Sequence, residues 1–184
     1  MNYSEIYWNR TVDGPGVRVS LYVSGCSHRC DGCHNEETWD FLYGRPFTKE
    51  VEDAVLAGCE HPWISGMSLL GGEPLEPRNQ EAVFGLLKRF MERFGAEKTV
   101  WLWTGCVWES DMAAGGKSSR RWRTEFTDGI LSMVDVLVDG PFVESRKCLG
   151  LVYRGSENQR IFKMEGGIPV ADMTAAAGWS NRPT

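Results

Sequence analysis

Apolar runs separated by amphipathic segments recur along most of this chain. Continuous apolar runs at Val17–Val23, Met67–Leu70 and Thr99–Trp103 predict buried strands. Between the last two, Asn79–Phe94 places apolar side chains three and four positions apart, which predicts an amphipathic helix. We expect this helix to end at Gly95 and to contribute its apolar face to the core.

A shorter helix is predicted between the first two strands. Thr48 is in position to cap its N-terminus, and Glu50 and Glu52 complement the positive end of the helix dipole. Because glycine commonly ends helices, we expect this one to run to Ala57 and to stop at Gly58.

Strands that alternate with helices predict βαβ units and an α/β fold with a mostly parallel sheet. Further strands are expected within residues 131–138 and at Ile161–Met164, and residues 1–10 are interpreted as an edge segment over the first strand. The 184 residues of this chain predict one domain, and they are too few for a closed eight-fold barrel, which needs ~250 residues. Residues 166–184 lack periodicity and are rich in alanine, glycine and proline, which predicts a weakly ordered C-terminal tail.

Composition and charge narrow the range of partners. The formal net charge of −5 offers no general attraction for nucleic acid or for an anionic membrane surface. No apolar run approaches the ~20 residues that span a bilayer. Six cysteines without a recognisable secretory signal predict free thiols in a reducing compartment. We therefore expect a cytoplasmic protein that binds neither nucleic acid nor membrane.

The basic segment Lys117–Arg123 contrasts with this acidic background. Trp122 interrupts its cations, a pattern that is compatible with contact to RNA or to a protein partner. A solvated connector is the commoner meaning of such a charge run, and we favour it. The Gly-Lys-Ser sequence at 116–118 is not a phosphate-binding loop, because Asp111 stands where that motif requires glycine.

Three cysteines follow the first predicted strand in the spacing C-x3-C-x2-C. Each thiolate can hold one iron of a 4Fe-4S cluster, so Cys26, Cys30 and Cys33 would leave the fourth iron without a protein ligand. Such an iron can bind a substrate or a second cofactor, which favours chemistry at the cluster over simple electron transfer. The alternative is a structural zinc site with His34 as the fourth ligand. The closeness of these ligands in sequence, without a second ligand pair elsewhere, favours the cluster.

Other candidates among the cysteines and histidines give weaker signals. Cys59, Cys106 and Cys148 are isolated, and free cysteine is often a small buried hydrophobe, so their roles stay open. His28 lies inside the cysteine loop and is expected to face solvent. No combination of histidine, aspartate and serine indicates acid–base or nucleophilic catalysis.

A second candidate site ends the strand predicted at Met67–Leu70. Gly71-Gly72-Glu73-Pro74 combines glycines, which let the backbone approach a ligand closely, with a proline that stiffens the exit. An ordinary strand-to-loop turn would have the same composition. Placed one βα unit after the cysteine loop, the turn resembles a ligand-binding motif of a known enzyme family, and we favour a binding role.

Together, these segments resemble the radical S-adenosylmethionine (SAM) enzymes, and within them the activases of glycyl radical enzymes. The resemblance is strongest to the activating proteins of anaerobic ribonucleoside-triphosphate reductase, and it covers residues 1–163 in order. At Cys106 that family often carries tyrosine. The segments that carry the resemblance are Asn2-Tyr3, Asp13–Arg18, Val23–Cys26, Gly32-Cys33 with Asn35, Gly71–Pro74, Trp103–Gly105, Val136–Gly140 and Arg154–Gln159.

The resemblance implies a small, open, partial (β/α) barrel of radical SAM type over residues 1–165, with its site at the carboxyl ends of the strands. It implies a 4Fe-4S cluster that is held by Cys26, Cys30 and Cys33. A branched side chain at Gly72 is then expected to impair SAM binding more than folding. The residues that the resemblance places against S-adenosyl-L-methionine are Gly32, Cys33, His34, Gly71, Gly72 and Glu73.

The implied reaction is a reductive cleavage of SAM to methionine and a 5′-deoxyadenosyl radical, with no catalytic residue beyond the cluster ligands. That radical would take a hydrogen atom from a glycine of anaerobic ribonucleoside-triphosphate reductase. The electron would come from a low-potential donor such as flavodoxin.

Two alternatives to this function stay open. The first is an activase of another glycyl radical enzyme, or a small-molecule radical SAM enzyme of the deazaguanine synthase type. The segment Arg154–Gln159 and the shortness of the chain favour the reductase activase over both. The second alternative is a zinc-binding adaptor without enzymatic activity.

Overall fold

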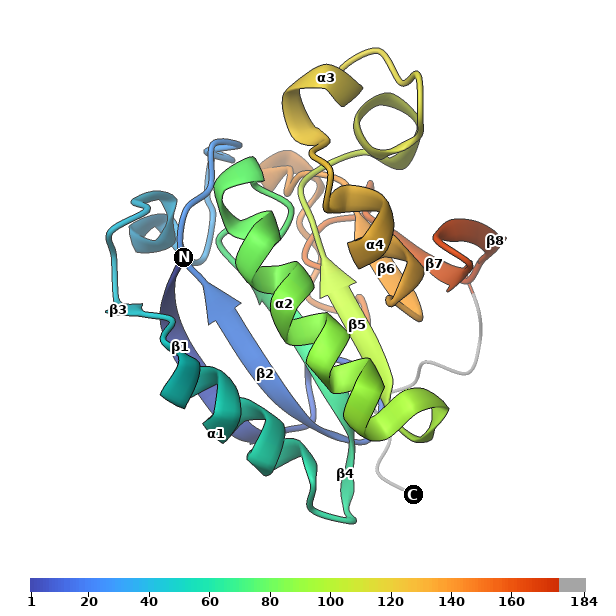
Figure 1. Ribbon diagram of the computed structural model, residues 1–184. Coiled ribbons are helices and arrows are strands. Elements are labelled where there is room, and N and C mark those ends of the chain that lie inside the picture. The colour runs from blue at the N-terminus through green and yellow to red at the C-terminus, as the bar shows by residue number, and fades with distance from the viewer. Residues whose placement is uncertain (176–184) are drawn as a thin grey trace.

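The computed structural model describes residues 1–175 and contains one open eight-stranded sheet in the order β3-β1-β2-β4-β5-β6-β7-β8 (Figure 1). The strands are β1 Asn2–Arg10, β2 Val17–Val23, β3 Arg45–Pro46, β4 Ile64–Gly71, β5 Thr99–Trp103, β6 Val136–Asp139, β7 Arg160–Glu165 and β8 Ile168–Asp172. The helices are α1 Lys49–Cys59, α2 Pro77–Phe94, α3 Ser119–Trp122 and α4 Thr127–Ser132. Short 3-10 or π-helical turns lie at Glu36–Trp39, Gly95–Glu97, Trp108–Met112 and Glu144–Arg146.

The sheet is parallel in its centre and antiparallel at both sides. β2, β4, β5 and β6 are parallel to one another, as the alternation of strands and helices predicts. β1 and β3 pair antiparallel on one side of this centre, and β7 and β8 on the other, so the sheet as a whole is mixed. The strands predicted at Val17–Val23 and Thr99–Trp103 are confirmed with the same bounds.

Strand β8 lies where the sequence predicted a weakly ordered tail. Gly166 and Gly167 have φ angles of 57° and 86°, and they join β7 to β8 in a tight two-residue hairpin. Antiparallel pairing then continues along the two strands as far as Asp172. Residues 168–172 therefore form a regular strand, contrary to the expected weakly ordered tail. The part of this expectation that concerns residues 176–184 lies outside the described residues.

Helices α1, α2 and α4 cover one face of the sheet, where the main core lies (Figure 1). α2 begins at Pro77, where a missing N–H costs no hydrogen bond, and it ends at Phe94, followed by the capping residue Gly95 with a φ of 51°. Among the described residues, we find no helix with the length and apolar character needed to cross a membrane. The apolar residues that α2 buries are Val83, Leu86, Leu87, Phe90 and Phe94, all on the predicted stripe.

α1 does not stop at Gly58, as the sequence led us to expect, but continues to Cys59. Val55, Leu56 and Cys59 are buried in the core, and this packing outweighs the ~1 kcal/mol that one glycine costs a helix. A side chain at position 58 would meet the ring of Trp8 at 2.9 Å. Gly58 therefore permits close packing between α1 and β1 and does not end the helix.

The opposite face of the sheet contains a fully buried arginine on β2. The guanidinium of Arg18 donates to the hydroxyl of Ser68 at 2.7 Å and to the carbonyl of Met67 at 2.8 Å. It also donates to the hydroxyl of Thr99 at 3.0 Å and to the carbonyl of that residue at 2.8 Å. Burial lowers the pKa of Arg18 to about 10, so the group stays charged at neutral pH and connects β2, β4 and β5.

We expect Arg18→Ala to lower the free energy of unfolding by about 3 kcal/mol, because several buried acceptors would lose their donor. Urea unfolding followed by circular dichroism measures this change. Arg18→Lys should recover part of the loss, since an ammonium replaces some of these bonds. An unchanged urea midpoint in Arg18→Ala would show that the arginine does not stabilise the sheet.

Candidate functional site

The loops that follow the parallel strands meet at one edge of the sheet, around an open cavity of about 580 Å³. Carboxyl ends of parallel strands share an edge, so residues far apart in sequence become neighbours there. Gly32 is not among the lining residues and lies beside the side chain of Glu144, with a φ of 71°. The other predicted site residues all line the cavity: Cys26, Cys30, Cys33, His34, Gly71, Gly72 and Glu73.

Each of the three loop cysteines accepts a hydrogen bond from at least one backbone N–H. Such bonds favour the thiolate over the thiol and adjust the reduction potential of a bound iron–sulfur cluster. They also hold each sulfur in a defined direction. The pairs run from Asn35 to Cys33 at 3.4 Å, from Phe142 to Cys30, and from His28 and Arg29 to Cys26.

In the absence of a metal, burial favours the protonated thiol over the thiolate. It raises the pKa of Cys26 to about 12, with a further contribution from the charge of Glu73. Burial also raises the pKa of Cys30. Both thiols therefore stay protonated until a cation replaces the proton, and metal binding at this loop releases protons.

The placement of the sulfurs bears on the choice between a cluster and one zinc ion. The ligands of a single tetrahedral zinc lie within ~4 Å of one another. Across residues 1–175, the group of His, Cys, Asp or Glu ligand atoms found within 4.8 Å of one another is His28, Glu73 and Cys106. The loop cysteines and His34 do not form such a group, so within the described residues they are not gathered around a single ion.

The turn at Gly71–Glu73 packs directly against the cysteine loop. Glu73 donates its N–H to the carbonyl of Gly25 at 3.0 Å. A Cβ on Gly72 would lie 2.9 Å from the carbonyl oxygen of Gly25 and 3.0 Å from that of Thr38. Because this backbone supports the cysteine loop, a side chain at Gly72 would displace the loop itself. A branched residue at Gly72 would therefore act directly on the cysteine loop, beside any effect on SAM binding.

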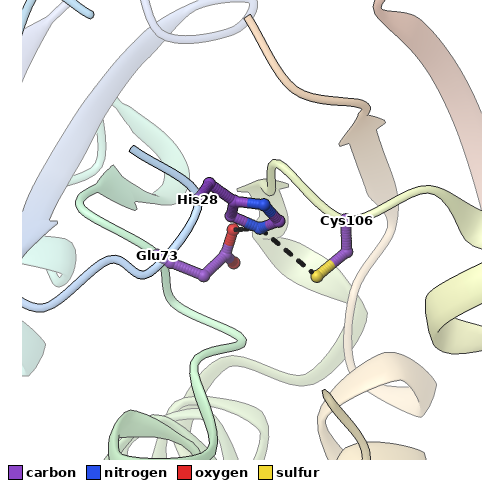
Figure 2. A group of neighbouring side chains, drawn as sticks. All are labelled: His28, Glu73 and Cys106. Carbon is purple, nitrogen blue, oxygen red and sulfur yellow. Dashed lines mark hydrogen bonds and ion pairs between the residues drawn. The ribbon is translucent and has the colours of Figure 1, made fainter. Parts of the chain in front are cut away.

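The carboxylate of Glu73 is fully buried and connects three loops (Figure 2). One oxygen accepts hydrogen bonds from the N–H of Leu75 at 2.9 Å and from the hydroxyl of Thr104 at 2.8 Å. The other accepts from the N–H of Gly105 at 2.8 Å and lies 3.1 Å from Nε2 of His28. This set of donors compensates the cost of removing a carboxylate from water.

His28 does not face solvent, contrary to the sequence-based expectation. Its ring stacks on that of Trp122, with 4.4 Å between centroids and 15° between planes. Burial alone would lower the pKa of His28, but its hydrogen bond and charge interaction with Glu73 outweigh this, and the pKa is raised. Nε2 also lies 3.6 Å from Sγ of Cys106. Since both oxygens of Glu73 already accept two contacts each, we interpret this group as a hydrogen-bonded network and not as a metal site.

The sequence did not identify the segment around α3 as part of this site. Trp122 is only 4% exposed, and Arg121 donates to the hydroxyl of Ser27 at 3.1 Å. The expectation of a solvated connector is therefore confirmed for Lys117 and Arg120, which are exposed, and is wrong for Trp122, which is buried. The tryptophan between cations was the one signal of this contact, and it did not reveal the partner.

The three remaining cysteines are free thiols. Cys59 and Cys106 are buried, and Cys148 is half-buried. Burial raises the pKa of Cys59 to about 12 and raises the pKa of Cys106 still further. Cys59 and Cys106 are therefore unreactive thiols at neutral pH.

Comparison with known proteins agrees with an iron–sulfur site. A family model described as a 4Fe-4S single cluster domain matches residues 12–162. A protein of Vibrio cholerae is 39% identical over 165 residues, 89% of this chain and 98% of its own length. One of Escherichia coli K12 is 38% identical, covering 86% and 96%, and one of Enterobacteria phage T4 is 36% identical, covering 91% and 97%. All three are named anaerobic ribonucleoside-triphosphate reductase-activating protein.

We expect Cys26→Ala, Cys30→Ala and Cys33→Ala each to abolish iron retention under anaerobic purification, because one iron loses its protein ligand. Iron analysis and the visible absorbance spectrum measure this. The matched controls are alanine variants of the three other cysteines, which should keep normal iron content. Iron loss in one of those controls, together with a dispensable loop cysteine, would contradict the ligand assignment.

Gly72→Ala should lower iron content and SAM affinity together, because the added Cβ presses on the carbonyls of Gly25 and Thr38. Gly85→Ala on α2 is the matched control, since nothing lies within 4 Å of a Cβ there. Iron analysis and equilibrium dialysis of SAM separate the two effects. Normal iron content with lost SAM affinity would instead assign Gly72 to SAM binding alone.

Proposed function

This chain belongs to the family of anaerobic ribonucleoside-triphosphate reductase-activating proteins and contains a 4Fe-4S single cluster domain, and we propose that it is the radical SAM activase of such a reductase. It is an oxidoreductase that cleaves S-adenosyl-L-methionine reductively at its cluster. The outcome is a glycyl radical on the reductase, which is the protein substrate.

One observation carries this proposal. The cysteine loop after β2 and the Gly71–Glu73 turn after β4 line the same cavity of about 580 Å³. A cluster ligand set and a glycine turn suited to close backbone approach therefore face one space. That volume lies in the range of small-molecule sites, about 300–1,000 Å³.

The residues present fit the groups that this function requires. Cys26, Cys30 and Cys33 would hold three irons and leave the fourth without a protein ligand, and the backbone donors on their sulfurs favour thiolate ligands. When bound, the cluster and SAM together supply a one-electron cleavage that yields a 5′-deoxyadenosyl radical. The zinc alternative has less support, because the same cysteines and His34 are not gathered around one point.

The protein residues orient the groups and enclose them. The ring of His34 lies 5.9 Å from that of Phe142 at the cavity wall, where the two would flank the adenine. The Gly71–Glu73 turn would offer backbone carbonyls to the amino group of the methionine moiety. Gly32 lies outside the lining residues, so we assign it to the bend of the loop.

Part of the cavity wall is polar. The carboxylate of Asp13 accepts a hydrogen bond from the hydroxyl of Tyr22 at 3.2 Å and one from Nε of Arg10 at 3.3 Å. Arg154 and Tyr153 also line this space. We assign this part of the cavity to the glycine loop of the reductase, which must enter if a backbone hydrogen is to reach the radical.

The proposal has consequences at the level of the fold. The open sheet would be the partial (β/α) barrel of the radical SAM enzymes, with residues 1–165 as its domain. The electron would come from a low-potential carrier such as flavodoxin, and the reaction would take place in the cytoplasm. Because the chemistry needs no acid–base group, no further catalytic side chain is assigned.

We expect deuterium placed only on the α-carbon of the reductase glycine to appear in 5′-deoxyadenosine, because the radical takes that hydrogen directly. The experiment combines the anaerobic protein, SAM, dithionite and the labelled reductase. Electron paramagnetic resonance detects the glycyl radical, and mass spectrometry detects the label.

Two results would count against this function. Unlabelled 5′-deoxyadenosine beside a fully formed glycyl radical would require an intermediate carrier of the hydrogen. Stoichiometric zinc in a colourless protein, without SAM cleavage, would instead support the adaptor alternative.

A further inference from the structure

A small basic surface lies beside the cysteine loop. It consists of Lys117, Arg120 and Arg121, all exposed, and we call it the α3 surface. The neighbouring Arg123 forms an ion pair with Asp128. Within residues 1–175, no acidic side chain forms an ion pair with the three cations of the α3 surface. The charges of Lys117 and Arg120 are therefore available to a partner, on a chain whose formal net charge is −5, whereas Arg121 also contacts Ser27 and the ring of Trp122.

The α3 surface is attached to the part of the loop that separates two of the assigned cluster ligands. Arg121 donates to the hydroxyl of Ser27 at 3.1 Å, and Trp122 stacks on His28 at 4.4 Å. Ser27 and His28 both lie between Cys26 and Cys30. Figure 1 shows α3 beyond the ends of α2 and α4, so a partner can approach it without meeting the core helices.

We propose that the α3 surface docks an acidic one-electron carrier protein that reduces the cluster. The inference rests on the proposed function, which requires an electron from outside the chain. In the step, the carrier is oxidised by one electron and the cluster is reduced by one electron, and no bond or proton moves. Opposite charges favour this encounter and accelerate it at low ionic strength.

The surroundings of the α3 surface favour a protein carrier over RNA. Binding of single-stranded RNA uses exposed aromatic rings on which bases stack, but Trp122 is only 4% exposed and already covers His28. Three cations also provide few phosphate contacts. A second hollow at the loop is lined by Glu36, Glu37 and Asp40 together with one cation, Arg29, so acidic groups outnumber basic ones there and disfavour an acidic carrier. The α3 side is therefore the favourable approach to the cluster loop.

The test compares two charge reversals at exposed helix positions. Arg120→Glu reverses one charge of the α3 surface. Lys88→Glu reverses one charge on α2, at a position about 16 Å along that helix from its first residue, Pro77. Neither side chain has a hydrogen bond or ion pair among the described residues, so both variants should fold normally. Stopped-flow spectroscopy follows cluster reduction by an acidic flavodoxin that has been reduced beforehand.

We expect Arg120→Glu to lower the second-order rate at low salt about threefold or more, and Lys117→Glu/Arg120→Glu to lower it about tenfold. Lys88→Glu should match the unmodified protein. The differences should vanish at about 1 M salt, where the Debye length is about 3 Å. Reduction by dithionite, and SAM cleavage driven by it, should be the same in all variants.

Several outcomes would overturn this inference. Equal rates in the double variant and the unmodified protein, or equal slowing by Lys88→Glu, would remove the α3 surface from carrier docking. A lower glycyl radical yield with dithionite in the double variant would assign the surface to the reductase instead. Loss of binding to single-stranded RNA with unchanged carrier rates would assign it to RNA. Failure of dithionite to drive SAM cleavage in the unmodified protein would instead refute the proposed function.

Discussion

The buried carboxylate of Glu73 is the constraint on which the site depends. A carboxylate without water requires a donor for nearly every lone pair, and here the donors come from His28, Leu75, Thr104 and Gly105. Those residues belong to the loops after β2, β4 and β5. The three loops can therefore adopt only arrangements in which they surround the same charge. The cysteine loop, which has no regular secondary structure of its own at the sulfurs, takes its position from this requirement.

The central strands and the α2 helix were predictable from the sequence because each rests on local information, and the spacing that singles out the three cysteines is local as well. Apolar runs and a helical stripe reflect burial on one face, and a glycine or a proline at a helix end acts within one turn. The segments after β2 and β4 could be expected at one site because parallel strands share an edge. The parallel register that pairs Val23 with Gly71 then brings the cysteine loop and the glycine turn into contact.

The contacts that hold the site together were not predictable, because each joins residues far apart in sequence with ordinary local patterns. His28 was expected to face solvent because a histidine between two cysteines gives no sign of a carboxylate that lies 45 residues further along the chain. Trp122 looked like part of a solvated connector for the same reason. Gly58 was expected to end a helix and Gly166-Gly167 to belong to a tail, but the ring of Trp8 packs against the first and the pair forms the turn between β7 and β8. Tertiary packing, and not propensity, decides such positions.

The fold also separates two approaches to the same loop. The cavity reaches the loop from the side of Asp13, Tyr22 and Tyr153, away from the face that α1, α2 and α4 cover. The α3 segment contacts the loop through Ser27 and His28, by way of Arg121 and Trp122. A group held by Cys26, Cys30 and Cys33 would therefore lie between an open cavity and a charged outer surface. In the proposed function an electron and a hydrogen atom are exchanged with two different proteins, and this division would let one partner bind before the other has left.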